Sequence, residues 1–227
     1  MTAEPRPPGG QTWPMLRAMV GIGLVCGLAI VLAYRWTLPV IERNRAEALR
    51  RAIFQVLPGA SSSATFRFDE PAGFAPAAGR AADARVVHAG YDAQGRWVGV
   101  AIEAAGMGYQ DTIRVLYGYA PDREAIVGFQ VLESRETPGL GDKIGLDPEF
   151  LANFEQLDVR LEADLSRLAH PIELVKKGEK EEAWQIDAIT GATVSSRAVA
   201  RILRASADFW IPKVRARAEQ LREEPQR

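Results

Sequence analysis

No charged residue occurs within residues 18–34, and the apolar stretch around this run covers residues 15–36. About 20 helical residues, each rising ~1.5 Å, are enough to cross a hydrocarbon core of ~30 Å. Aromatic side chains, which favour the membrane interface, stand at both ends of the stretch: Trp13, Tyr34 and Trp36. We therefore predict an uncleaved transmembrane helix. A cleaved signal peptide is the alternative, although the run is long for the apolar region of a signal peptide and Arg17 interrupts its start.

Arginines flank this apolar stretch unequally. Arg6 and Arg17 precede the uncharged run at 18–34, and a larger group follows this run: Arg35, Arg43, Arg45, Arg50 and Arg51. The positive-inside rule would keep the residues after the span in the cytoplasm. The rule weakens when a long domain follows, because such domains can cross the membrane regardless of flanking charge.

Composition limits what the rest of the chain can be. Of the 227 residues, 47% are hydrophobic and 25% charged, close to globular averages, so one domain of roughly 150 residues is possible besides the span. The formal net charge of −1 gives no support for nucleic-acid binding. The single cysteine, Cys26, excludes an internal disulfide and any multi-cysteine cluster made by this chain alone. His88 and His170 lack companions at metal-ligand spacing, so no metal site is predicted.

Changes of composition divide the chain. Residues 41–57 have helical spacing and end at a Pro-Gly pair, whereas residues 59–84 are rich in Ala, Ser, Gly and Pro with little periodicity. We predict five parts, in order: a disordered cytoplasmic tail at 1–14, the span at 15–36, a juxtamembrane helix and loose connector at 37–84, a folded domain at 85–211, and a charged C-terminal tail at 212–227.

The folded domain is predicted to be α+β. Alternation and turn residues indicate three strand pairs, each around a short turn: 85–88 with 96–103, 113–120 with 125–132, and 172–176 with 183–189. A short helix is predicted at 147–157 and a final helix at 194–210, with Pro212 kinking its continuation. Antiparallel strands with flanking helices are typical of this fold class.

A hydroxyl group stands at the predicted junction between the last strand and the last helix. Thr193 follows the small residues Gly191 and Ala192, which permit close approach of backbone and ligand. The N–H groups that open a helix attract anions, so the junction is suited to present a threonine oxygen to a phosphate. The alternative is an ordinary helix start in which Thr193 is a cap.

Two other segments are rich in glycine. Residues 133–144 contain the string Thr-Pro-Gly-Leu-Gly-Asp-Lys, and residues 106–113 contain Gly-Met-Gly followed by Tyr109. A Pro-Gly turn with a solvated charged rim would account for the first segment. A core or rim aromatic would account for Tyr109.

The motif from Asp187 to Thr193 resembles the flavinylation motif of the G subunit of Rnf ion-translocating electron transport complexes, which the C subunit of sodium-pumping NADH:quinone reductases shares. The string at 137–144 resembles a loop of the same G subunits, in the same order along the chain. The resemblance covers the span and most of residues 85–210. It implies a membrane-anchored domain of antiparallel strands with flanking helices that relays electrons through FMN, bound covalently to Thr193 by a phosphoester. It implies an electron-transfer subunit of an oxidoreductase with no substrate site of its own.

The resemblance also implies which residues surround the flavin and which proteins the chain meets. The implied cofactor-binding residues are Thr193, Asp187, Thr190, Gly191, Ala192, Ser195, Ser196, Thr137, Gly139, Leu140, Gly141, Lys143 and Tyr109. The residues after Tyr109 are Gln110 and Asp111, where the family usually has small residues, so a flavin contact by Tyr109 stays open. The implied partners are other membrane subunits of the complex and a flavin transferase that uses FAD and a divalent metal. The implied location is the bacterial inner membrane, with the domain on the periplasmic side, opposite to the arginine pattern.

Two alternatives remain at this point. One is the C subunit of a sodium-pumping NADH:quinone reductase. The other is a non-redox, membrane-anchored assembly or sensory module in which Thr193 is only a helix cap.

Overall fold

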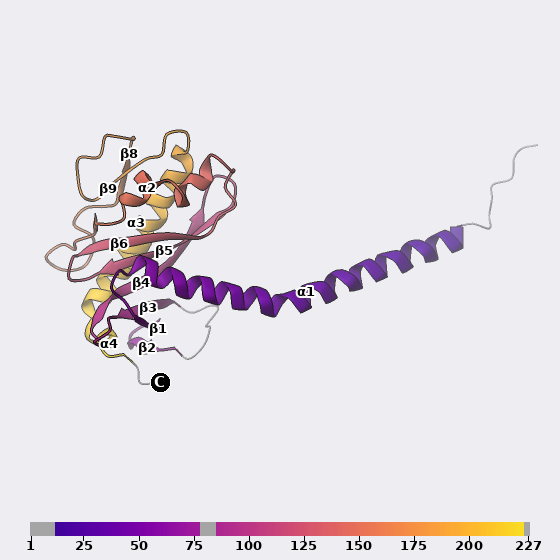
Figure 1. The fold of residues 1–227 in the computed structure, drawn as a ribbon, viewed down its shortest axis with the longest axis horizontal. Helices are drawn as coiled ribbons and strands as arrows, with labels where there is room; N and C mark the ends of the chain where they lie inside the picture. The colour runs from indigo at the N-terminus through magenta and orange to yellow at the C-terminus, as the bar shows by residue number, and fades with distance from the viewer. Residues whose placement is uncertain (1–11, 78–84, 225–227) are drawn as a thin grey trace, which may run out of the picture. The chain divides into compact units, whose positions relative to one another are not determined.

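The computed structural model describes residues 12–77 and 85–224 of the chain. The predicted disordered tail lies mostly outside the described residues. The elements are, in order (Figure 1), α1 (Thr12–Val56), β1 (Ser62–Asp69), β2 (Gly73–Pro76), β3 (Val86–Tyr91), β4 (Trp97–Met107), β5 (Thr112–Ala120), β6 (Ala125–Glu133), the 3-10 helix η1 (Gly141–Gly145), α2 (Pro148–Ala152), β7 (Leu157–Asp158), β8 (Glu173–Val175), β9 (Gln185–Asp187), α3 (Thr193–Ala216) and α4 (Glu219–Arg222). The chain divides into two compact units, at residues 1–47 and 48–227.

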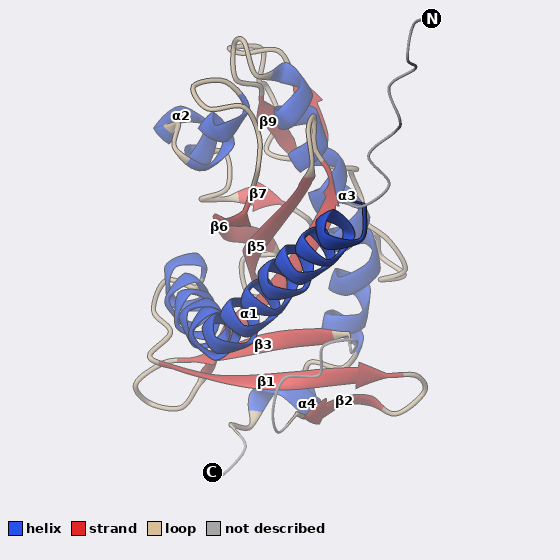
Figure 2. Ribbon diagram, turned by 90° about the vertical axis from the view of Figure 1, so that its right-hand side faces the viewer, coloured by secondary structure: helices blue, strands red, loops and turns tan. Residues whose placement is uncertain are grey.

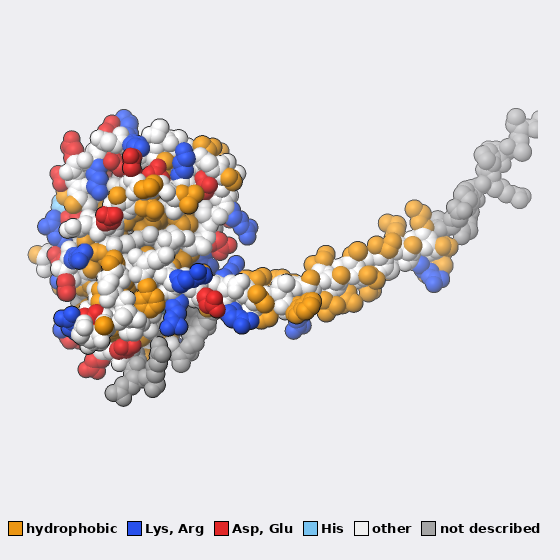
Figure 3. Space-filling model, viewed as in Figure 1, with side chains coloured by type: hydrophobic (Ala, Val, Ile, Leu, Met, Phe, Trp, Pro, Cys, Tyr) orange, Lys and Arg blue, Asp and Glu red, His pale blue; other side chains and the backbone are white. Residues whose placement is uncertain are grey.

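The first unit contains the greater part of α1. Its apolar side chains are exposed, and on the face shown in Figure 3 they cover this part of the helix. The helix is long and apolar enough to cross a membrane, which agrees with the predicted span. The sequence predicted two helices, at 15–36 and 41–57, whereas the structure has one continuous helix with Pro39 inside it.

The second unit is built on a seven-stranded sheet with the order β2-β1-β3-β4-β5-β6-β7. All of its neighbouring strands are antiparallel, which confirms the two hairpins predicted around residues 92–95 and 121–123. A separate two-stranded sheet joins β8 and β9. This third predicted pair exists, but its strands are parallel and not antiparallel.

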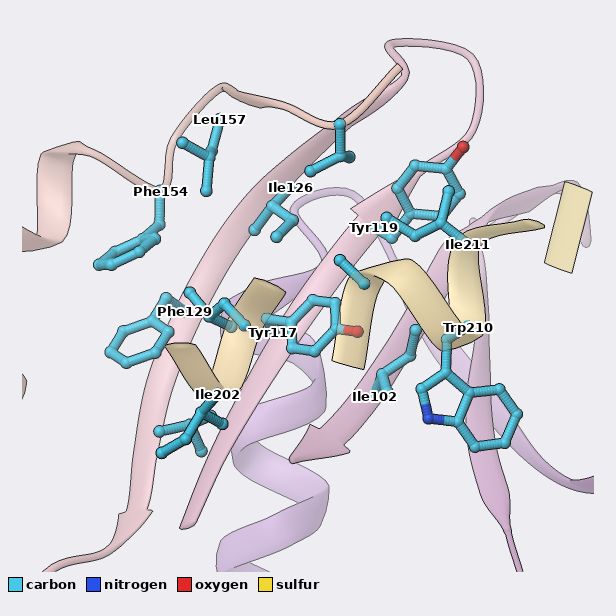
Figure 4. Packing of buried hydrophobic residues seen from close by; sticks show 14 of the residues in the cluster. Ile102, Tyr117, Tyr119, Ile126, Phe129, Phe154, Leu157, Ile202, Trp210 and Ile211 are labelled. Carbon is cyan, nitrogen blue, oxygen red and sulfur yellow. The ribbon is translucent and has the colours of Figure 1, made fainter. Parts of the chain in front are cut away.

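The two faces of the large sheet pack against different helices. On one face α3 packs on β4 and β5 (Figure 2), and alternate strand residues such as Ile102 and Tyr117 join α3 residues such as Trp210 in the main hydrophobic cluster (Figure 4). The intervening residues Ala101 and Leu116 belong to a second cluster, with the last turn of α1. Alternation along β4 and β5 therefore gives this part of the sheet two buried faces.

A row of glycines lets the last turn of α1 approach the sheet. The row consists of paired residues on four adjacent strands, Gly90 with Gly99 and Gly118 with Gly128. A Cβ atom at Gly118 would lie 1.9 Å from the carbonyl oxygen of Val56, and a Cβ at Gly128 would lie 2.5 Å from the Val56 Cα. No side chain fits at either position without moving backbone, so glycine is required here.

Several expectations based on local pattern are wrong. The expected loose connector at 59–84 contributes β1 and β2, which pair with each other and with β3. The helix expected at 147–157 is shorter, because α2 covers only Pro148–Ala152. Its start is as expected: the Asp147 side chain caps it, and Pro148 is its first residue. The last helix continues through Pro212 to Ala216, and α4 follows.

The residues expected to form a charged tail also pack on the domain. Leu221 is fully buried, and the carbonyl oxygen of Leu221 accepts a hydrogen bond of 2.9 Å from the hydroxyl of Tyr91. Pairing and burial of β1, β2 and α4 come from contacts with distant segments, which periodicity within each segment does not report.

Candidate functional site

The first turn of α3 presents its backbone N–H groups without a side-chain cap. The N-cap residue is Ala192, which makes no side-chain capping bond. The alternative in which Thr193 is the cap of this helix is therefore wrong. Thr193 is the first helical residue, its side chain is exposed, and in the part of the chain the structure describes its hydroxyl makes no hydrogen bond. The N–H groups of the first turn have no partner within the helix. A free hydroxyl thus stands beside free N–H donors.

The turn before α3 is fixed by Ser196. Its hydroxyl accepts a hydrogen bond of 3.1 Å from the Ile189 N–H and donates one of 3.0 Å to the Ala192 carbonyl oxygen. Within this turn Gly191 has a φ of +85°, a conformation that favours glycine. Thr190 and Gly191 are exposed, whereas Ala192, Ser195 and Ser196 are buried. These contacts hold the start of α3 in one position relative to β9.

A buried glutamate joins the three segments of the site. Glu136, only 5% exposed, accepts hydrogen bonds at Oε1 from the backbone N–H of Tyr109 (2.9 Å) and of Gln110 (3.0 Å). At Oε2 it accepts a short hydrogen bond from the hydroxyl of Ser195. We call Glu136, Ser195 and these two backbone groups the Glu136 cluster. The cluster connects the loop before β5, the loop after β6 and the first turn of α3.

Glu136 is ionised at neutral pH. Burial raises the pKa of its carboxyl group, but the hydrogen bonds from Ser195, Gln110, Tyr109 and Asp111 outweigh burial and hold the pKa below its usual value. The N-terminus of α3, where Ser195 lies in the first turn, also favours a negative charge. The site therefore contains a fixed buried carboxylate.

Exposed apolar side chains lie on or beside the segments that the Glu136 cluster joins. Tyr109 is 67% exposed and Leu140 51%, and Val194, next to Thr193, is 50% exposed. The backbone of Tyr109 belongs to the Glu136 cluster, and Val194 directly precedes Ser195 of that cluster. Leu140 directly precedes Gly141, which lies so close to Ser195 that a Cβ atom added to this glycine would be 2.7 Å from the Ser195 Oγ. Met107, also exposed, is the last residue of β4, just before the loop that contains Tyr109, and its carbonyl oxygen accepts a 2.7 Å hydrogen bond from Arg201 of α3. We call Met107, Tyr109, Leu140 and Val194 the apolar rim.

The string at residues 137–144, which we call the Pro-Gly loop, is held in shape by its own backbone. The carbonyl oxygen of Thr137 accepts hydrogen bonds from the N–H groups of Leu140 (3.1 Å) and Asp142 (3.4 Å), and Gly139 has a φ of +77°. Lys143 is half-buried and makes no ion pair within the described ranges. Its charge is available to an anionic ligand.

Asp187 has a different set of contacts from Thr193. Its Oδ1 accepts hydrogen bonds from the N–H groups of Gly178 (3.1 Å) and Lys180 (3.2 Å), and its own N–H donates to the Asn153 Oδ1 (3.0 Å). Asn153 also accepts from the Lys180 amino group, at 3.2 Å. Burial holds the pKa of the Lys180 amino group below its usual value, and the nearby charge of Asp187 offsets only part of this effect. Asp187 thus organises the turn between β8 and β9.

Sequence reasoning missed Glu136, Met107 and Val194 as members of the site. Glu136 stands directly before the Thr-Pro-Gly string, in a segment that a solvated charged rim would equally explain. Nothing in a single sequence distinguishes a buried glutamate from the exposed ones around it, because its donors come from residues 26 to 59 positions away.

The site coincides with a known kind of domain. Residues 108–208, which include the Glu136 cluster and Thr193, match the model of the FMN-binding domain family. Two solved structures share the fold: NqrC of Shewanella oneidensis (TM-score 0.54, 20% identity, 79% of this chain and 98% of that chain) and the C subunit of the Na⁺-translocating NADH-quinone reductase of Parabacteroides distasonis (TM-score 0.60, 16% identity, 78% and 96%).

Sequence relatives define the family more closely. The G subunit of the ion-translocating oxidoreductase complex of Methanosarcina acetivorans is 34% identical over 196 residues, which cover 84% of this chain and 90% of the relative. The protein of the same name from Pectobacterium atrosepticum is 36% identical over 134 residues, 58% of each chain. The chain therefore belongs to the family of G subunits of ion-translocating oxidoreductase complexes.

Proposed function

We propose that this chain carries FMN as a phosphoester of Thr193 and relays electrons as a membrane-anchored subunit of an Rnf-type ion-translocating oxidoreductase complex. The observation that carries the proposal is the exposed Thr193 hydroxyl at the uncapped N-terminus of α3, inside a matched FMN-binding domain. The flavin supplies the redox chemistry, and the protein binds and orients it.

The residues present fit FMN in both of its parts. A phosphodiester keeps one negative charge, which the N–H groups of Thr193, Val194 and Ser195 can stabilise at the start of α3. The apolar rim offers exposed side chains, one of them aromatic, to a planar ring system. Lys143, at the end of the Pro-Gly loop, supplies a positive charge that no described acidic group neutralises.

The remaining site residues have supporting roles in this proposal. Gly139 and Gly191 allow the backbone to approach the cofactor, Gly141 lets its loop pack on Ser195 and Glu136, and Ser196 fixes the turn that presents Thr193. Thr190 and Asp187 belong to the segment that a flavin transferase would recognise. The transferase and the other membrane subunits of the complex are the proposed partners.

The proposal is tested by denaturing gel electrophoresis of the full chain, made with and without a flavin transferase. A fluorescent flavin band is expected only with the transferase, because the bond is covalent. The tryptic peptide of residues 181–197, bounded by Lys180 and Arg197, should gain the mass of FMN less one water. A chain that stays unmodified beside an active transferase, or a modified peptide from elsewhere, would contradict the proposal.

We further propose that the domain lies on the periplasmic side of the inner membrane. The family resemblance supports this side, while the five arginines after the span favour the opposite one. A reporter that is active only outside the cytoplasm, fused after Arg227, is expected to be active. An active cytoplasmic reporter at the same position, with the periplasmic one silent, would reverse the assignment.

A further inference from the structure

We propose that Glu136 is the positioning residue of this site: its buried carboxylate holds the Tyr109 loop and the Pro-Gly loop against the first turn of α3. The contacts that carry this inference do not depend on the flavin. Its consequence for the flavin rests on the proposed function.

The carboxylate is the common partner of segments that are far apart in sequence. Tyr109 and Gln110 donate to one oxygen from the loop before β5, and Ser195 donates to the other from α3. Hydrogen bonds to an ionised acceptor are roughly twice as strong as neutral ones. Removal of the acceptor would leave two part-buried backbone N–H groups and a buried hydroxyl without this partner, which destabilises the contact between the two segments.

Two glycines show how closely the loops are packed on this carboxylate. A Cβ added to Gly108 would lie 2.5 Å from the Glu136 Oε1, and one added to Gly141 would lie 2.8 Å from the Oε2. The backbone at Gly108 and at Gly141 thus lies so close to the carboxylate that neither position has room for a side chain. Asp111, at the end of the same loop, is paired with the exposed Arg135 at 3.4 Å, and such a surface pair contributes little by itself. Arg201 of α3 also donates a 2.7 Å hydrogen bond to the Met107 carbonyl oxygen just before the loop, but its side chain is exposed, so the bonds of Glu136 are the buried part of the attachment.

This arrangement assigns Glu136 two effects on a bound cofactor. It fixes the separation of Tyr109, Leu140 and Val194, the side chains that would flank the ring. It also places a permanent negative charge close to the start of α3. A nearby negative charge opposes the addition of electrons, so it lowers the reduction potential of a flavin bound there.

Hydrogen exchange of the full chain, made without the transferase, tests the positioning role without any flavin. In Glu136→Leu, which removes every acceptor, peptides covering residues 106–112 are expected to exchange at least roughly tenfold faster, because about 1.4 kcal/mol corresponds to a factor of ten. Glu136→Gln keeps an acceptor but loses the charge, so a smaller increase, roughly fivefold, is expected. The matched control is Glu133→Gln, three residues earlier on β6, where the side chain is 38% exposed and loses the same charge.

Unchanged exchange of residues 106–112 in the Glu136 variants, or an equal change in Glu133→Gln, would overturn the inference. If Glu136→Leu does not fold, Glu136→Gln decides by the same comparison. In the transferase-treated chain, Glu136→Gln is expected to keep the covalent flavin but to shift its midpoint potential to a more positive value than in Glu133→Gln. A wild-type chain without flavin would refute the proposed function and leave the exchange result standing; flavin at an unaltered potential would refute the electrostatic effect of Glu136.

Discussion

Thr193→Val is expected to reduce covalent flavin from one per chain to none. Valine has nearly the shape of threonine but lacks the oxygen that the phosphoester needs. The fold should survive, because Thr193 is exposed and its hydroxyl makes no hydrogen bond in the described structure, so the free energy of unfolding should change by less than about 0.5 kcal/mol. In-gel flavin fluorescence and the mass of the 181–197 peptide, after expression with the transferase, measure the effect.

Two matched variants make this result specific to one hydroxyl. Thr193→Ser retains the oxygen and is expected to restore flavin attachment, at least in part. Thr112→Val makes the same chemical change at an exposed position at the start of β5 and should leave attachment unaltered. Flavin retained by Thr193→Val would show that another residue carries the bond, and Thr190, exposed two residues before Ala192, would be the first to examine.

Gly118→Ala is expected to lower the free energy of unfolding of the domain by about 3 kcal/mol, near the upper end of what overpacking costs. The added Cβ would meet the Val56 carbonyl oxygen at 1.9 Å, and a Cβ cannot rotate away from the backbone of another segment. Either the last turn of α1 must move off the sheet or β5 must bend. Denaturant unfolding of the full chain in detergent, followed by tryptophan fluorescence, measures the loss.

Gly145→Ala serves as the control for this substitution. Its Cβ would approach only the side chain of Val131, at 3.2 Å, which can adjust, so a loss within about 1 kcal/mol is expected. Equal stability of the two variants would show that the glycine row is not needed for the packing of α1 on the sheet.

The features that were predicted from sequence are those that adjacent residues specify. The span, the hairpins β3–β4 and β5–β6 and the start of α3 each follow from a hydrophobic run, an alternation or a strand-to-helix junction. The motif around Thr193 also indicated the family. Prediction failed where a segment has weak local periodicity but long-range partners, as in β1, β2 and α4.

The candidate site likewise contains residues that the sequence pointed to and residues that only the structure revealed. Residue chemistry pointed to the hydroxyl of Thr193, whereas the Pro-Gly loop and Tyr109 became candidates through the resemblance of their strings to the family. Only the tertiary structure brought in Glu136, whose burial depends on donors from two other segments. The apolar rim likewise became visible only when exposure was known.

The sequence by itself indicated a helix long and apolar enough to cross a membrane and an α+β domain with a hydroxyl at a helix start, because hydrophobic runs and periodicity are properties of short stretches. The tertiary structure decided that the helix start has no side-chain cap and that the hydroxyl makes no hydrogen bond in the described structure. It also decided that a buried carboxylate joins the loop before β5 to the first turn of α3, and that the end of α1 packs on a row of glycines. These facts depend on which distant groups meet. Burial and hydrogen bonding between distant segments are properties of the folded chain and not of any one segment.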